Sequence, residues 1–143
     1  MKCRKCGEKA AVNMRQHRLA LCGEHFLEWL PEQTERFIRK YEMFGREDRV
    51  LVAVSGGKDS LSLWDLLVRL GYKTEGLYIG LGIDGGNGYS DASRKCARTF
   101  AARNGLVLHE VDIQQEYGQP IPVLAEVSQR GRGRPCAVCG LTK

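Results

Sequence analysis

Residues 51–67 read LVAVSGGKDSLSLWDLL, and this stretch decides the fold that we expect. It begins with an apolar run typical of a buried strand, breaks at Gly56 and Gly57, and continues with the spacing of an amphipathic helix. In an open parallel sheet, ligands bind beyond the carboxyl ends of the strands. The turn after this strand is therefore the first place to look for a ligand site.

The side chains of this turn suit a phosphate group. Backbone N–H groups at the start of a helix attract anions, and Gly56 and Gly57 allow the backbone to come close to one. Lys58 adds a positive charge, and Ser55 and Ser60 offer hydroxyl donors. The turn is therefore a candidate site for the phosphates of a nucleotide.

Asp59 is unusual in an anion site because it adds negative charge. A carboxylate in this position is explained if a Mg²⁺ ion bridges it to the phosphates. The alternative interpretation is an ordinary glycine-rich turn in which Asp59 caps the helix. The turn is not a Walker P-loop, since Val52 stands where that motif requires a glycine, and it does not contain the dinucleotide pattern G-x-G-x-x-G.

The sequence around this turn alternates strands and helices. The expected elements are strands at 49–54, 74–81 and 106–113, helices at 59–70 and 90–104, and a further helix near 123–129. This βαβαβ order predicts an α/β domain with a parallel sheet and right-handed crossovers. Ser90 is the expected N-cap of the second helix. The glycines of residues 80–86 would let an adenine or ribose approach the sheet edge, with a flexible loop as the alternative.

Four metal-ligand residues occur near the N-terminus. Cys3-x2-Cys6 is followed, after fifteen intervening residues, by Cys22-x2-His25. Two such knuckles can place four ligands in a tetrahedron, and this donor set suits a structural zinc ion. A segment of this length cannot build a core alone, so the metal would supply its folding free energy. The alternative, scattered buried cysteines, leaves the spacing unexplained.

A second cysteine pair, Cys136-x2-Cys139, lies in a segment that has no acidic residue from Val127 to Lys143. Its arginines would favour thiolates. The pair could form a disulfide, hold zinc, ligate an iron–sulfur cluster or carry sulfur. The basic run also suits contact with an RNA backbone, with a solvated basic loop as the alternative. Cys96, on the second expected helix, is interpreted as a core residue.

The bulk composition indicates a soluble globular protein. The chain has 143 residues, 43% of them hydrophobic, and a net charge of +5, which allows an anionic partner. No membrane span or secretory signal is visible, so we expect a cytoplasmic location and reduced cysteines. We expect a zinc finger at 1–25, a linking helix at 26–48 that Pro31 kinks or restarts, and a nucleotide-binding domain at 49–143. Only 95 residues remain from Arg49, so this domain is expected to be incomplete.

The three motifs together resemble one family. The two knuckles, SGGKDS at 55–60 and C-x-x-C-G at 136–140 occur in the order found in the tRNA 2-thiolation enzymes, the TtcA/TtuA family of PP-loop ATP pyrophosphatases. The N-terminal finger makes the chain most similar to the TtuA branch. The resemblance implies an ATP-dependent sulfurtransferase that adenylates O2 of a tRNA uridine or 5-methyluridine and replaces it with sulfur.

The resemblance also implies roles for single residues. It implies zinc ligation by Cys3, Cys6, Cys22 and His25; ATP binding by Ala53, Ser55, Gly56, Gly57, Lys58, Asp59, Ser60, Ile79 and Lys143; and catalytic roles for Lys58, Asp59, Cys136 and Cys139. Cys136 and Cys139 would be two of the three ligands of a 4Fe–4S cluster, whose third ligand this chain lacks. The implied cofactors are ATP, Mg²⁺, Zn²⁺ and this cluster, and the implied partners are tRNA and a ubiquitin-like sulfur-carrier protein. The resemblance also allows a homodimer, and it implies no membrane partner.

Two other functions stay open from the sequence. One is a zinc-containing RNA-binding fragment without catalysis. The other is a different PP-loop enzyme, such as a tRNA lysidine synthetase or an amidotransferase partner. These other enzymes do not need the C-x-x-C pair, so alanine at Cys136 should leave them active.

Overall fold

The computed structural model describes residues 1–83, 88–127 and Cys139. The chain divides into two compact units, Met1–Arg46 and Glu47–Lys143, which we call the N-terminal and C-terminal units and describe separately. Among the described residues, no helix combines the length and the hydropathy that crossing a membrane requires.

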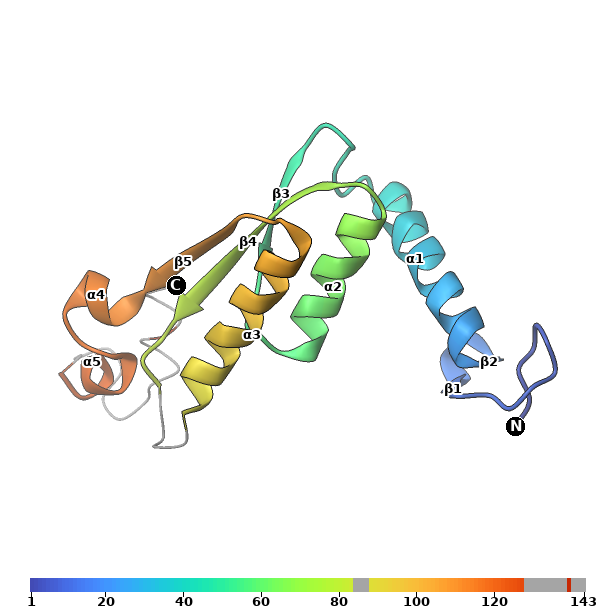
Figure 1. The fold of residues 1–143 in the computed structure, drawn as a ribbon, viewed down its shortest axis with the longest axis horizontal. Coiled ribbons are helices and arrows are strands. Elements are labelled where there is room, and N and C mark those ends of the chain that lie inside the picture. Colours follow the sequence, from blue (N-terminus) through green and yellow to red (C-terminus); the bar gives the residue numbers. More distant parts are fainter. Residues whose placement is uncertain (84–87, 128–138, 140–143) are drawn as a thin grey trace. The chain divides into compact units, whose positions relative to one another are not determined.

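The C-terminal unit contains a parallel sheet of three strands. Its strands are β3 (Arg49–Ala53), β4 (Lys73–Gly80) and β5 (Leu108–Asp112), in the order β3-β4-β5 (Figure 1). Val52 lies opposite Gly76, and Gly76 lies opposite Leu108. The expected α/β class with a parallel sheet is confirmed.

The crossover helices, α2 (Lys58–Arg69) and α3 (Tyr89–Asn104), pack side by side on one face of the sheet (Figure 1). Trp64 of α2 is fully buried beneath them and donates from Nε1 to Thr74 Oγ1 at 3.0 Å. Its ring lies 5.2 Å from that of Phe100 on α3. A Cβ on Gly76 would lie only 2.4 Å from the indole ring, so glycine in β4 makes room for the core tryptophan.

The expectation that β3 is a fully buried strand is wrong. Leu51 is 56% exposed, whereas its neighbour Val52 is 5% exposed. Both helices cover the same sheet face, so alternate residues of β3 point away from them. Beyond β5 the chain forms α4 (Ile113–Tyr117) and α5 (Ile121–Val127), of which only the second was expected.

The N-terminal unit consists of a hairpin and a helix. Strands β1 (Val12–Met14) and β2 (Leu19–Leu21) pair in antiparallel fashion through a short 3-10 turn, η1 (Arg15–His17), and α1 (Gly23–Lys40) follows directly. A small core forms between them from Leu21, Cys3 and Cys22, which are buried, with Phe26 and Trp29 packed against it.

The helix α1 differs from the expected linking helix at 26–48. It begins three residues earlier, so His25 lies in its first turn, and it continues through Pro31. It ends at Lys40 because Glu42 takes a left-handed conformation with φ of 47°. The Glu42 N–H donates to Arg39 O and the Met43 N–H to Ile38 O, which is a Schellman motif without the usual glycine.

Two expectations for α3 are also wrong. Gly88, not Ser90, is its N-cap, and the Ser90 hydroxyl instead donates to Ile83 O at 2.8 Å. Cys96 is exposed rather than part of the core. The buried face of α3 is formed by small residues, with Ala97 fully buried and Ala101 4% exposed.

Candidate metal and nucleotide sites

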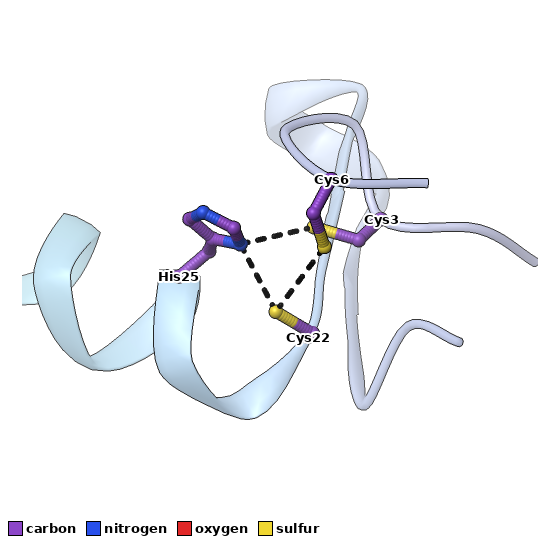
Figure 2. A group of neighbouring side chains, drawn as sticks. All are labelled: Cys3, Cys6, Cys22 and His25. Carbon is purple, nitrogen blue, oxygen red and sulfur yellow. Dashed lines mark hydrogen bonds between the residues drawn. The ribbon is translucent and has the colours of Figure 1, made fainter. Parts of the chain in front are cut away.

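The N-terminal unit brings its four expected metal ligands together. The donor atoms of Cys3, Cys6, Cys22 and His25 all lie within 4.8 Å of one another (Figure 2). Nδ1 of His25 lies 3.6 Å from Cys3 Sγ and 3.1 Å from Cys22 Sγ, and Cys6 Sγ lies 3.8 Å from Cys22 Sγ. In a tetrahedral zinc site the ligand atoms lie about 3.6–3.8 Å apart. Two of the three distances match this geometry, and the third is shorter.

Each ligand is held by local backbone structure. The first knuckle is a tight turn in which the Gly7 N–H donates to Cys3 O and the Cys3 N–H to Glu8 O. Gly7 has φ of 78°, a left-handed conformation that favours glycine. Cys22 immediately precedes α1, and His25 lies in the first helical turn. The hairpin and the helix start therefore meet at the site.

The thiols of this cluster influence one another. Burial raises the pKa of Cys3, but hydrogen bonds from the backbone of Cys22, Cys6 and Lys5 outweigh it and lower the pKa to about 6. A backbone hydrogen bond from Glu8 lowers the pKa of Cys6, but desolvation and the neighbouring thiols raise it to about 11. A thiolate on one cysteine thus disfavours ionisation of the neighbouring thiol, and a bound divalent cation would offset the repulsion between the two thiolates.

The nucleotide candidate begins where β3 ends. Gly57 is the N-cap of α2, and the helix starts at Lys58. The Ser60 hydroxyl accepts from the Ser55 N–H at 3.2 Å and donates to Gly57 O at 3.1 Å. The interpretation of Asp59 as the helix cap is wrong, because its carboxylate instead accepts from Lys58 Nζ at 3.0 Å.

The charged side chains of this turn face solvent. Lys58 and Asp59 are 87% and 90% exposed, so both are accessible to a ligand. The first intrahelical bond of α2 runs from the Leu61 N–H to Gly57 O. The N–H groups of residues 58–60 therefore have no partner inside the helix. The turn offers backbone donors, an ammonium group and a carboxylate to one ligand.

The backbone of α3 constrains the residue type at position 56. Gly56 has a φ of 76°, and a Cβ there would lie 2.0 Å from the carbonyl oxygen of Ser93 on α3. Gly57 has an ordinary φ of −78°, and a Cβ there would have one close neighbour, Ser55 Oγ at 3.4 Å. Gly56 therefore allows the turn to pack closely against α3.

A cavity of about 420 Å³ lies next to the turn, a size suitable for a small ligand. Ala53, Ser55 and Ile79, all expected ATP-binding residues, line it. Tyr78, which also lines it, is buried and hydrogen-bonds with its hydroxyl to Ser93 Oγ at 2.8 Å.

Among the lining residues that were not expected, three carry hydroxyl groups: Tyr78, Ser90 and Ser93. The two serines lie one helical turn apart at the start of α3, the helix that follows β4 in the chain. That position is the signal that could have identified them, since the helix following β4 starts at the same sheet edge.

An ion-pair network stabilises the same edge of the sheet. Gly80 leaves space for the guanidinium group of Arg94, which would lie 2.3 Å from a Cβ there. Arg94 donates to the Asp112 carboxylate at 2.7 Å and lowers the pKa of Asp112. Its guanidinium group also lies 5.7 Å from the centre of the Tyr78 ring. The network links α3 to the end of β5.

The remaining expected site residues are only partly described. Cys136 and Lys143 lie outside the described residues. Cys139 packs against a hydrophobic cluster formed by Ile113, Ile121 and Ala125.

The chain is similar to several known proteins. Residues 2–27 match the family model "2-thiouridine synthetase TtuA, N-terminal LIM domain". The full chain is 50% identical to a tRNA-5-methyluridine(54) 2-sulfurtransferase of Thermus thermophilus and covers 43% of it. The corresponding protein of Pyrococcus horikoshii is 40% identical over the full chain, which covers 44% of it.

The resemblance to the tRNA 2-thiolation enzymes is confirmed. Cytoplasmic tRNA 2-thiolation protein 1 of Drosophila pseudoobscura is 32% identical over 96% of the chain and 40% of its own length. The U34-tRNA thiolase NcsA from Methanococcus maripaludis, solved with its [4Fe-4S] cluster, has a TM-score of 0.70 and 26% identity. That similarity covers 99% of this chain and 47% of NcsA. The chain thus spans less than half the length of these members of the tRNA 2-thiolation family.

Proposed function

We propose that this chain forms the ATP-binding and metal-binding part of a tRNA 2-thiolation sulfurtransferase. The single observation that carries the proposal is the turn at residues 55–60. It places unpartnered helix N–H groups, Lys58 and Asp59 beside the 420 Å³ cavity at the ends of β3 and β4. Relatives named for tRNA 2-thiolation are similar to the chain over almost its whole length.

In this proposal, the phosphates of ATP bind at the start of α2, and the nucleoside occupies the cavity. Lys58 offsets phosphate charge, and Asp59 binds a Mg²⁺ ion that contacts the same phosphates. Ala53 and Ile79 would contact the nucleoside, since both line the cavity. The turn would hold ATP so that a uridine oxygen of tRNA attacks the α-phosphorus and pyrophosphate leaves.

The N-terminal cluster is proposed as a structural zinc site. Three cysteines and one histidine complete a four-ligand set without an open position, which is typical of structural rather than catalytic zinc. The two distances near 3.7 Å, Cys3–His25 and Cys6–Cys22, support this choice. Zinc would join the first knuckle to the start of α1.

Other parts of the proposal follow from the family alone. Cys136 and Cys139 would contribute thiolates to a 4Fe–4S cluster, and Lys143 would contact ATP. A ubiquitin-like protein would supply sulfur, the enzyme could be a homodimer, and the location would be cytoplasmic. The naming of related proteins as tRNA 2-sulfurtransferases supports tRNA as the substrate.

Replacing Lys58 with alanine should weaken ATP binding at least tenfold. Loss of a charge-assisted contact costs about 1.5–3 kcal/mol, whereas the fold should be unaffected because this side chain is 87% exposed. Isothermal titration with Mg-ATP measures the affinity, and urea unfolding checks the fold. Lys95→Ala is the matched control, since Lys95 is also an exposed lysine of this unit but lies on α3. Equal ATP affinity in the Lys58 variant and the wild type would contradict the assignment.

A further inference from the structure

The positive charge of the chain is concentrated in its first 22 residues. These residues contain six Lys and Arg and one acidic residue, whereas residues 23–143 contain sixteen of each sign. The entire net charge of +5 therefore belongs to less than a sixth of the chain. A divalent cation bound by three thiolates would change this charge by only one unit, so metal binding would leave the segment strongly basic.

Neighbouring acidic residues do not neutralise this charge. In the C-terminal unit, basic side chains pair with carboxylates, as Arg98 does with Glu110 at 2.8 Å. In the first 22 residues, Lys5 pairs with Glu28 at 3.5 Å. The remaining basic residues of the segment are exposed and form no ion pair with any residue that the structure describes. We call them the basic cluster: Lys2, Arg4, Lys9, Arg15 and Arg18.

The backbone holds part of this cluster in an unfavourable arrangement. Lys2 and Lys9 lie directly opposite each other in an antiparallel bridge. Like charges in that position repel and destabilise the pairing. Arg18 has φ of 48° and ψ of 36°, the left-handed conformation that side chains other than glycine rarely adopt. An anion bound at the cluster would remove the repulsion between the two lysines.

We propose that the basic cluster binds phosphate groups of the tRNA backbone. The proposal rests on the proposed function, which makes an RNA the partner of this chain. Exposed Lys and Arg side chains bind phosphates without reading sequence, and they release counterions when they do so. The Arg4 N–H donates to Ala20 O at 2.9 Å, so the first knuckle is tied to the hairpin that carries Arg15 and Arg18.

The metal site would make this surface conditional on a bound cation. Four of the five residues of the basic cluster lie between the ligands Cys3 and Cys22, and Lys2 directly precedes Cys3. Because such a short segment has only a small core, loss of the metal should disperse the charged side chains. RNA affinity should therefore fall when the metal is removed, even at constant net charge of the polypeptide.

The test is the binding of fluorescein-labelled tRNA to the 143-residue chain, followed by fluorescence anisotropy at several salt concentrations. The variant is Lys2→Gln/Lys9→Gln. We expect affinity about tenfold lower at low salt and a log–log salt slope reduced by about 1.4–1.8, since each phosphate contact contributes about 0.7–0.9. The variant should keep its metal content, because the substitution removes a repulsion.

The matched control is Lys95→Gln/Arg103→Gln, which removes the same charge from exposed positions of α3. Equal losses of affinity in the two double variants would overturn the proposal, because net charge alone would then explain binding. An unchanged salt slope in Lys2→Gln/Lys9→Gln would also overturn it. The proposal would be overturned as well if Lys2→Gln/Lys9→Gln lost binding to anionic phosphatidylserine vesicles but kept its binding to tRNA.

ATP titration of the same variant separates the two proposals. Unchanged ATP affinity together with weakened tRNA binding supports the basic cluster independently of the nucleotide site.

Discussion

Substituting Gly56 with alanine should destabilise the C-terminal unit by about 2–4 kcal/mol and abolish measurable ATP binding. Two effects combine at this position. The residue has φ of 76°, and the new Cβ would lie 2.0 Å from the backbone oxygen of Ser93. That oxygen cannot rotate away as a side chain could, so the turn or the start of α3 must move. Urea unfolding and Mg-ATP titration measure the two consequences.

Gly118→Ala is the control for the contribution of backbone conformation. Gly118 has a similar φ of 74°, but a Cβ there would meet nothing within 4 Å. We expect it to cost only about 1 kcal/mol and to leave ATP affinity unchanged. If the two substitutions cost the same, the close contact between the turn and α3 does not matter for stability.

Removing the metal ligand Cys22 should unfold the N-terminal unit. Structural zinc contributes about 10–16 kcal/mol of apparent free energy to small zinc-binding folds at neutral pH, more than the small core of this unit can replace. In Cys22→Ser, we expect bound zinc to fall from one ion per chain to a small fraction. The backbone amide signals of residues 1–22 should collapse in a two-dimensional NMR spectrum, while those of the sheet persist.

Cys96→Ser is the matched control for this substitution. Cys96 is exposed on α3 and does not belong to the metal cluster. It should keep full zinc content and an unchanged spectrum outside its surroundings. Zinc-free wild-type protein with a folded N-terminal unit would show that the cysteines are not metal ligands in this protein.

The fold was predictable where spacing and type of residue agree. The strand–turn–helix at residues 51–67 predicted the parallel α/β arrangement, because the spacing of apolar residues changes from that of a strand to that of a helix at the glycines of the turn. The metal cluster was predictable because each knuckle positions its own pair of ligands. Neither inference needed contacts between distant residues.

The incorrect predictions concern features of the structure that depend on tertiary contacts. The end of α1 depends on Glu42 adopting a left-handed conformation, for which the sequence has no glycine signal. Cys96 has the apolar character of a core residue, but the adjacent Ala97 occupies the buried face. The close approach of Gly56 to the backbone of Ser93 brings together two residues that are 37 positions apart in the sequence. A motif identifies the glycine but not this neighbour.

Competition between ATP and pyrophosphate tests the nucleotide assignment most directly. Mg-ATP is titrated into the 143-residue chain by calorimetry, first alone and then with excess magnesium pyrophosphate. If the turn at residues 55–60 binds the phosphates, ATP should bind at one site per chain, and pyrophosphate should weaken it at least tenfold. Absence of ATP binding, or ATP affinity that pyrophosphate leaves unchanged, would contradict a phosphate site at the start of α2.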